Sequence, residues 1–219
     1  MSEDPILDPT SARLAPLFQW QKTGDFAHQV TKLDEDAKGD LLTDGRWKPL
    51  REALILRDFA VTLGYTECKL CPEKEQFPDA MLRSSESELQ IEITEVLTAG
   101  RKRDKEYKDF KENPIQKAVS HHEWDEVEEA GSNWVAWTAA AVKKKLKYSK
   151  NTKFDIVVYN NISHLFEMPE IAQLSKNVGV LLAEAGYQSH WVWQCRSTTI
   201  DLLWPRVLRL KIPGWKDRF

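Results

Sequence analysis

The sequence predicts an α/β fold, with a mixed central sheet and helices on both of its faces. Residues 47–63 and 133–148 carry apolar side chains at helical spacing. Residues 88–96 alternate between apolar and polar side chains, as a half-buried strand does, and residues 154–159 form the short apolar run typical of a central strand. These helical and strand segments alternate along the chain, which favours an α/β sandwich.

The first helix is expected over residues 47–63. Pro49 suits a first helical turn, and Gly64 is the usual residue just beyond a helix end. Its broad apolar side is predicted to contain Leu50, Ala53, Leu54, Arg57, Phe59, Val61 and Leu63. Residues 1–45, with scattered prolines and acids, predict a loosely held N-terminal arm with a short helix in 18–33, ahead of a domain over 46–219.

The charge of the chain is slightly negative, at −3, so no overall basicity indicates a nucleic-acid partner. Positive charge is nevertheless concentrated at residues 101–103, at 143–150 and in the tail from Arg206. The chain also has nine tryptophans, most of which are expected in the core, although some could stack on bases.

Three cysteines, an odd number, argue against a disulfide framework and for a cytoplasmic protein. No apolar run is long enough to span a bilayer, and the acidic N-terminus is unlike a signal peptide, so no membrane partner is expected. Cys68 and Cys71 form a C-x-x-C pair. Zinc would need two further ligands, for which Cys195 and His190 are the candidates, and small buried residues beside a strand are the favoured interpretation.

Residues 77–96 predict a β-hairpin with a turn at residues 84–87. Counting outward from that turn places Asp79 opposite Glu92. Paired side chains lie about 4.5–5.5 Å apart at Cβ, where two negative charges repel. A divalent cation between them would offset the repulsion, because Mg²⁺ prefers oxygen ligands and often takes only one or two carboxylates. The alternative is a register shifted by one residue, with the acids on a solvated polar face.

A second helix is expected over residues 133–148, with lysines near its end. Its apolar side is predicted to contain Trp134, Trp137, Thr138, Ala141, Val142 and Leu146. The preceding His121 and His122 are interpreted as exposed residues or as part of a substrate-contacting loop. The remaining predicted elements are a helix over 169–185 and strands over 190–195, 198–203 and 206–212.

The predicted elements from residue 47 onward follow the order helix, three strands, helix and strand. Three acids lie on these elements or directly beside them. Asp79 follows Pro78, Glu92 begins the tripeptide Glu92-Ile93-Thr94, and Glu52 lies on the preceding helix. In these features the chain resembles the PD-(D/E)XK nuclease superfamily over residues 47–160. The resemblance implies a restriction-endonuclease-like α/β/α sandwich.

The resemblance also implies a metal-dependent nuclease that hydrolyses phosphodiester bonds. Asp79 and Glu92 would bind Mg²⁺ or Mn²⁺, with Glu52 a direct or water-mediated ligand. Nucleic acid, with DNA the expected kind, would be held through its phosphates by basic residues, for which the candidates are Arg101, Lys102, Arg103, Lys143 and Lys144. The choice between DNA and RNA, between ends and interiors, and between monomer and homodimer stays open.

Thr94 departs from the family pattern, which has lysine at this position to orient or activate the attacking water. Three accounts are open: a lysine or arginine from elsewhere, with Lys102 or one of residues 143–145 the candidates; hydrolysis by the metal alone; or an inactive site. Glu95 points to the opposite face and should not replace Thr94. The alternative functions are an inactive nuclease-fold module that binds nucleic acid or protein, and an unrelated α/β domain.

Overall fold

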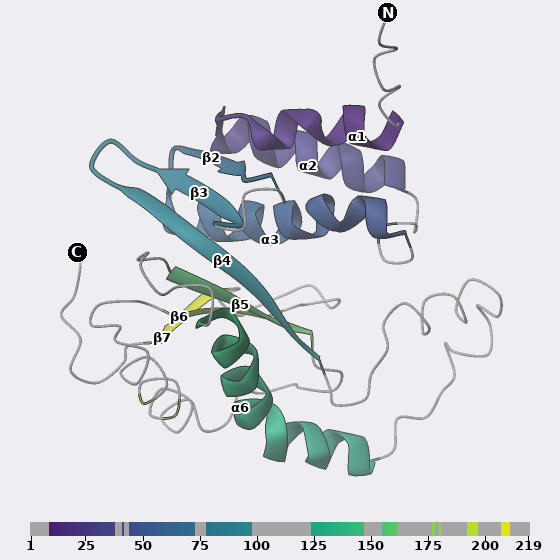
Figure 1. Cartoon of the computed structure of the whole chain (residues 1–219), viewed down its shortest axis with the longest axis vertical. Helices are drawn as coiled ribbons and strands as arrows, with labels where there is room; N and C mark the ends of the chain where they lie inside the picture. Colours follow the sequence, from purple (N-terminus) through teal and green to yellow (C-terminus); the bar gives the residue numbers. More distant parts are fainter. Residues whose placement is uncertain are drawn as a thin grey trace, which may run out of the picture. The chain divides into compact units, whose positions relative to one another are not determined.

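The computed structural model describes residues 9–37, 41, 44–72, 78–97, 124–146, 155–161, 177, 180, 192–196 and 207–210 (Figure 1). In chain order its elements are α1 Pro9–Leu14, η1 Ala15–Phe18, β1 Gln21–Lys22, α2 Thr23–Ala37, η2 Gly45–Trp47, α3 Lys48–Leu63, β2 Glu67–Leu70, β3 Ala80–Arg83, β4 Glu88–Leu97, α6 Trp124–Leu146, β5 Asp155–Asn161, β6 Val192–Arg196 and β7 Val207–Leu210.

The chain divides into two compact units, and the division falls between Glu88 and Leu89. The described elements from α1 to β3 belong to unit 1, and those from β4 to β7 belong to unit 2. The sequence analysis places a boundary at residues 45–46 instead. Each unit has its own helices and strands.

Helix α3 of unit 1 confirms the first predicted helix. Pro49 lies in its first turn, and Gly64 ends it with a left-handed φ of 72°. The buried side follows three-residue steps and consists of Leu50, Ala53, Leu56, Phe59 and Ala60. The predicted side was wrong at Val61, which is 57% exposed. The burial follows this different stripe because α3 packs against both α2 and β2.

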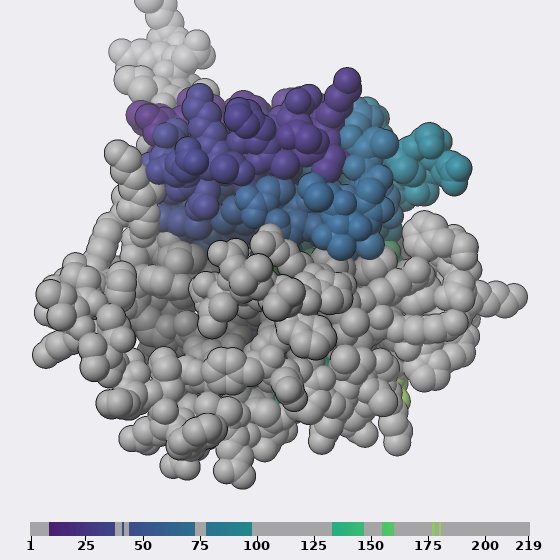
Figure 2. All heavy atoms as spheres, turned by 180° about the vertical axis from the view of Figure 1, so that it is seen from behind, coloured from purple at the N-terminus to yellow at the C-terminus, as the bar shows by residue number. Residues whose placement is uncertain are grey.

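The N-terminal segment is more ordered than the predicted arm. Residues 23–37 form one amphipathic helix, α2, which packs on α3. Its buried side chains are Thr23, Phe26, Val30, Leu33 and Ala37. Figure 2 shows the side chains of α1, α2 and α3, purple to blue, as one continuous surface of unit 1. The short helix expected within residues 18–33 is thus confirmed in part, because α2 begins at Thr23 and extends to Ala37.

Strands β1, β2 and β3 form an antiparallel set in unit 1. One face of β2 and β3 is buried and consists of Cys68, Leu70, Ala80 and Leu82. The opposite face carries Glu67, Lys69, Met81 and Arg83, which are half-buried. After β3, the amide of Ser84 donates a hydrogen bond of 2.8 Å to the carbonyl of Ser87, so the predicted turn is confirmed.

Unit 2 combines parallel and antiparallel strands. β5 runs parallel to both β4 and β6, while β7 is antiparallel to β6. β5 is therefore an interior strand of this unit, as predicted for residues 154–159. The strands and helices together make this chain an α/β protein with a mixed sheet.

Helix α6 packs on β5 and begins at Trp124, earlier than the predicted start at residue 133. The boundary was wrong because the polar residues before Asn133 hide the helical period. The predicted apolar side is confirmed for its buried members Trp134, Thr138, Ala141, Val142 and Leu146.

Two predicted elements fall largely outside the described residues. The helix over 169–185 is described only at Asn177 and Val180, both helical, and the strand over 198–203 is not described. The described helices include none that is both long enough and apolar enough to cross a membrane.

Candidate functional site

Glu92 is a buried acid in the middle of β4. Its residue exposure is 2%, and its neighbours Ile91 and Ile93 are buried as well. Burying an isolated carboxylate is costly, so such a group requires a compensating charge or hydrogen bond. The solvated polar face that the alternative register predicts is therefore wrong for Glu92.

Lys145 supplies the compensating charge. Its Nζ donates a hydrogen bond of 2.7 Å to Oε2 of Glu92. The lysine side chain is 22% exposed, so its stem is largely covered while its ammonium group reaches the carboxylate. A buried carboxylate and a mostly buried ammonium group thus meet in unit 2.

The local sequence explains how Lys145 reaches Glu92. β4 and β5 are parallel, and α6 lies in the chain between them. On α6, Thr138, Val142 and Lys145 follow one another at helical spacing and therefore share a side, which buries Thr138 and Val142. Lys145 lies in the last turn, where the helix dipole favours a positive charge.

Lys145 belongs to the set of lysines that the sequence analysis names as substitutes for the motif lysine. Thr94, two residues after Glu92, is half-buried. The other named candidate, Lys102, lies outside the described residues. The structure therefore places beside Glu92 a lysine that comes from α6 and not from β4.

The other two predicted acids belong to unit 1. Asp79 lies in the bend before β3, and its backbone carbonyl accepts a hydrogen bond of 2.9 Å from the amide of Cys71. Glu52 lies on α3, with Lys48 Nζ 3.7 Å from its Oε1. Because Glu92 belongs to unit 2, the predicted pairing of Asp79 with Glu92 stays a prediction.

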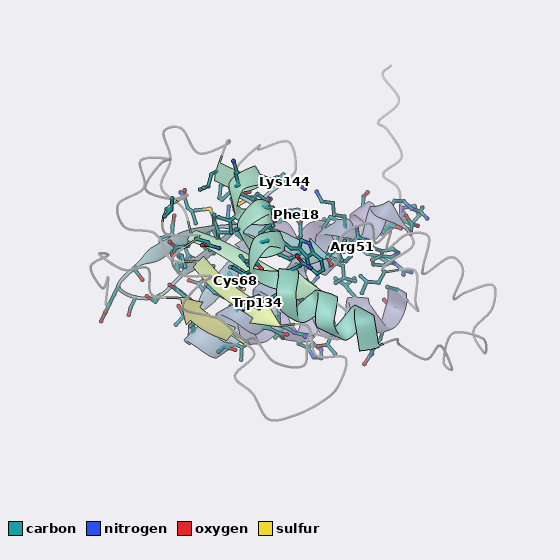
Figure 3. The ribbon with its side chains drawn as sticks, turned by 90° about the horizontal axis from the view of Figure 1, so that it is seen from below. Phe18, Arg51, Cys68, Trp134 and Lys144 are labelled. Carbon is teal, nitrogen blue, oxygen red and sulfur yellow. The ribbon has the colours of Figure 1, made fainter. Side chains whose placement is uncertain are left out.

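The predicted nucleic-acid contacts are described only on α6. Lys143 and Lys144 are exposed in the last turn of this helix, and Figure 3 shows Lys144 near its end. Residues 101–103 lie outside the described residues. On the described part of α6, exposed positive charge therefore lies next to the Glu92–Lys145 pair in sequence.

Side chains that could bind a metal do not cluster in the part of the chain that the structure describes. In the described ranges, no group of three or more His, Cys, Asp or Glu side chains lies together. Cys68 and Cys71 are both buried, as the favoured interpretation predicts, and neither forms a disulfide. Burial raises the pKa of the Cys68 thiol to about 12, so this thiol stays protonated at neutral pH. Of the two further zinc ligands proposed, Cys195 lies in β6 and His190 lies outside the described residues.

A second charged cluster, in unit 1, was not predicted from the sequence. Arg83 donates to Glu67 through Nε at 2.6 Å and through Nη2 at 3.0 Å. The hydrogen bonds from Arg83 hold the pKa of Glu67 below its ordinary value, and Glu67 raises that of Arg83. The guanidinium carbon of Arg83 also lies 4.3 Å from the ring centre of Trp20. Alternating charges on β2 were a signal for this cluster, but its partners come from other strands.

Comparison of the chain with protein-family models, with curated proteins and with solved structures finds no match.

Proposed function

We propose that this chain is a metal-dependent nuclease that hydrolyses phosphodiester bonds in nucleic acid, with DNA the expected substrate. The observation that supports the proposal most directly is the hydrogen bond from Lys145 to the buried carboxylate of Glu92. An acid and a lysine in contact are two of the groups that the resemblance implies, although Thr94 stands at the usual lysine position.

The order of elements also supports the proposal. The described chain contains α3, then β2, β3 and β4, then α6 and β5, which is the order on which the resemblance depends. β4 and β5 are parallel, so α6 is a crossover connection. This is the expected core of a restriction-endonuclease-like sandwich, and the finer assignment remains part of the proposal.

The available donor groups fit a hard divalent cation. Carboxylate oxygens are the ligands that Mg²⁺ and Mn²⁺ prefer, and one or two from the protein are often sufficient. Glu92 and Asp79 would hold the cation, with Glu52 as a direct or water-mediated ligand. When bound, a divalent cation supplies charge at the scissile phosphate and lowers the pKa of a bound water.

The chain's own residues would have distinct roles. Lys145 would contribute the positive charge that Thr94 lacks, and would orient the attacking water or a phosphate oxygen through its N–H groups. Thr94 can hydrogen-bond a water but brings no charge. Lys143 and Lys144, exposed at the end of α6, would contact phosphates of the substrate without reading its sequence.

Cleavage assays test the proposal. Plasmid, linear duplex, single-stranded DNA and RNA are incubated with the purified chain and Mg²⁺ or Mn²⁺. We expect cleavage by the wild type and none by Glu92→Ala. Glu95→Ala is the matched control, since Glu95 is the next acid on β4 but alternates to the other face, and it should retain activity. Absence of cleavage on all four substrates would contradict the proposal.

A variant of Lys145 separates its role from that of the metal ligands. Lys145→Met should lose cleavage while Mn²⁺ binding, measured by calorimetry, persists. Asp79→Ala should lose Mn²⁺ binding as well. If Lys145→Met cleaves as the wild type does, Lys145 does not replace the motif lysine.

The second candidate is an inactive nuclease-fold module that binds nucleic acid or protein. It is favoured by the same contact, because a carboxylate that already has a lysine partner is neutralised without a metal. This candidate predicts no heat of Mn²⁺ binding in either the wild type or Asp79→Ala. A Mn²⁺-dependent difference between these two proteins would reject it.

A further inference from the structure

In unit 1, positively charged side chains lie around a tryptophan on the face of β1, β2 and β3 that is not buried. The register places Lys22 of β1 opposite Glu67 of β2, and Glu67 opposite Arg83 of β3. Because side chains alternate along a strand, Lys69 points to the same face as Glu67. Lys22 is exposed, and Glu67, Lys69 and Arg83 are half-buried. We call Trp20, Lys22, Lys69 and Arg83 the cation–aromatic cluster.

Trp20 brings two of these cations together. The guanidinium carbon of Arg83 lies 4.3 Å from its ring centre, and Nζ of Lys69 lies 5.4 Å from it. Both distances are within the range of cation–π attraction. The ring therefore interacts with two positive groups from the same face of the sheet.

Glu67 fixes the orientation of Arg83. It accepts hydrogen bonds from Nε and Nη2 of the guanidinium group. The Arg83 side chain nevertheless keeps 40% exposure, so the group is held in place and still reaches solvent. A fixed, partly exposed guanidinium group loses little side-chain entropy when it binds an anion, which favours binding.

The charge of this face identifies the chemistry of a partner. The cations Lys22, Lys69 and Arg83 lie near the carboxylate of Glu67, which is bound to Arg83, and the charge of Glu88 also acts on Arg83. These three cations and two carboxylates leave an excess of one positive charge, on a chain whose net charge is −3. Cations interleaved with an aromatic ring suit phosphates and bases better than they suit isolated carboxylates.

We propose that the cation–aromatic cluster binds a single strand of nucleic acid, with Arg83, Lys69 and Lys22 on its phosphates and Trp20 beside a base. The inference rests on the proposed function for its choice of ligand, and it adds a substrate contact in unit 1 to those predicted on α6. Binding through this face requires no metal. It can therefore be measured apart from cleavage.

Fluorescence anisotropy with a labelled oligothymidylate, in EDTA and over a series of KCl concentrations, tests the proposal. Lys69→Gln should weaken binding severalfold and reduce the slope of log K against log salt by about 0.7, the value for one phosphate contact on a single strand. Lys32→Gln is the matched control, because Lys32 is an exposed lysine of the same unit on α2, and its slope should equal that of the wild type. Equal effects of the two substitutions would overturn the proposal.

One further variant separates stacking from charge. Trp20→Leu removes the ring and keeps every charge, so affinity should fall about fivefold or more at an unchanged salt slope. Circular dichroism verifies that each variant is folded. If no substrate is cleaved but Lys69→Gln still weakens binding, the hydrolytic function fails and this inference stands.

Competition with polyglutamate determines whether the ligand is a nucleic acid. The oligothymidylate should resist displacement by polyglutamate of equal charge. Displacement at equal concentration would show a surface for acidic proteins and would overturn the proposal.

Discussion

Glu92 shows how much a single residue can depend on its surroundings. In the sequence it is one of several polar residues in an alternating strand, yet in the structure it is almost fully buried against Lys145. A buried pair of this kind adds little net stability, whereas removal of one partner is expensive.

Substitution of Lys145 should show how much stability is lost when Glu92 no longer has this charged partner. We expect Lys145→Met to lower the free energy of unfolding by about 2 kcal/mol, less than the ~3–5 kcal/mol of a fully buried pair, because the lysine is 22% exposed. Glu92→Gln in the same chain should restore part of the loss. Urea unfolding of both single variants and the double variant measures the coupling, with the exposed Lys144→Met as control. Additive losses would contradict a direct interaction.

The Glu67–Arg83 pair predicts a pH dependence of stability. The pKa of Glu67 in the folded chain lies below the ordinary 4.5, mainly because Arg83 donates hydrogen bonds to the carboxylate. A lowered pKa contributes stability above pH 4.5, and the contribution disappears as the pH falls through the folded pKa.

Glu67→Gln removes this contribution. Urea midpoints should therefore differ between the wild type and Glu67→Gln at pH 7, and the difference should shrink at pH 3. A difference that is the same at both pH values would show that the carboxylate charge is not involved.

At the scale of elements, α3 shows which helix signals are reliable. Pro49 and Gly64 mark its ends correctly, because their effects on the backbone are local. The buried side was less predictable. Val61 fits the sequence period but lies in solvent, since the positions of α2 and β2 decide which stripe of α3 is covered.

Alanine substitutions of two glycines at helix ends should change the free energy of unfolding in opposite directions. An added Cβ meets no atom within 4 Å at either Gly24 or Gly64, so only the backbone conformation distinguishes them. Gly64→Ala should lower the free energy of unfolding by about 1 kcal/mol, because φ is positive there. Gly24→Ala, in the first turn of α2, should raise it by up to about 0.5 kcal/mol. Thermal unfolding measures both, and equal signs would contradict this account.

For the whole molecule, the N-terminal segment is part of the fold. Phe26 and Val30 of α2 are fully buried, and α2 packs on α3. Unit 1 therefore depends on residues that the sequence analysis assigns to an arm.

Phe26→Ala should test this dependence. We expect a loss of about 3–5 kcal/mol in the free energy of unfolding, the usual cost of removing a buried aromatic side chain. His28→Ala, exposed on the same helix, is the control and should change stability by less than about 0.5 kcal/mol. Urea unfolding followed by far-ultraviolet circular dichroism measures both. Similar, small effects would show that α2 is not needed for the fold.

Local chemistry makes some features readable in the sequence. Alternation of apolar and polar residues identifies β4, the apolar run identifies β5, and the serine-rich turn at residues 84–87 is confirmed by its hydrogen bond. Each of these signals depends on residues that are neighbours in the chain. The α/β class follows from them, and so do Glu92 and the set of lysines that contains Lys145.

Only the tertiary structure selects Lys145 from its neighbours and places its ammonium group on Glu92, 53 residues away in the chain. It likewise brings Trp20 to Arg83. Such contacts depend on how strands pair and on which side of a helix is covered. These are properties of packing between distant segments, and no local pattern of residues encodes them by itself.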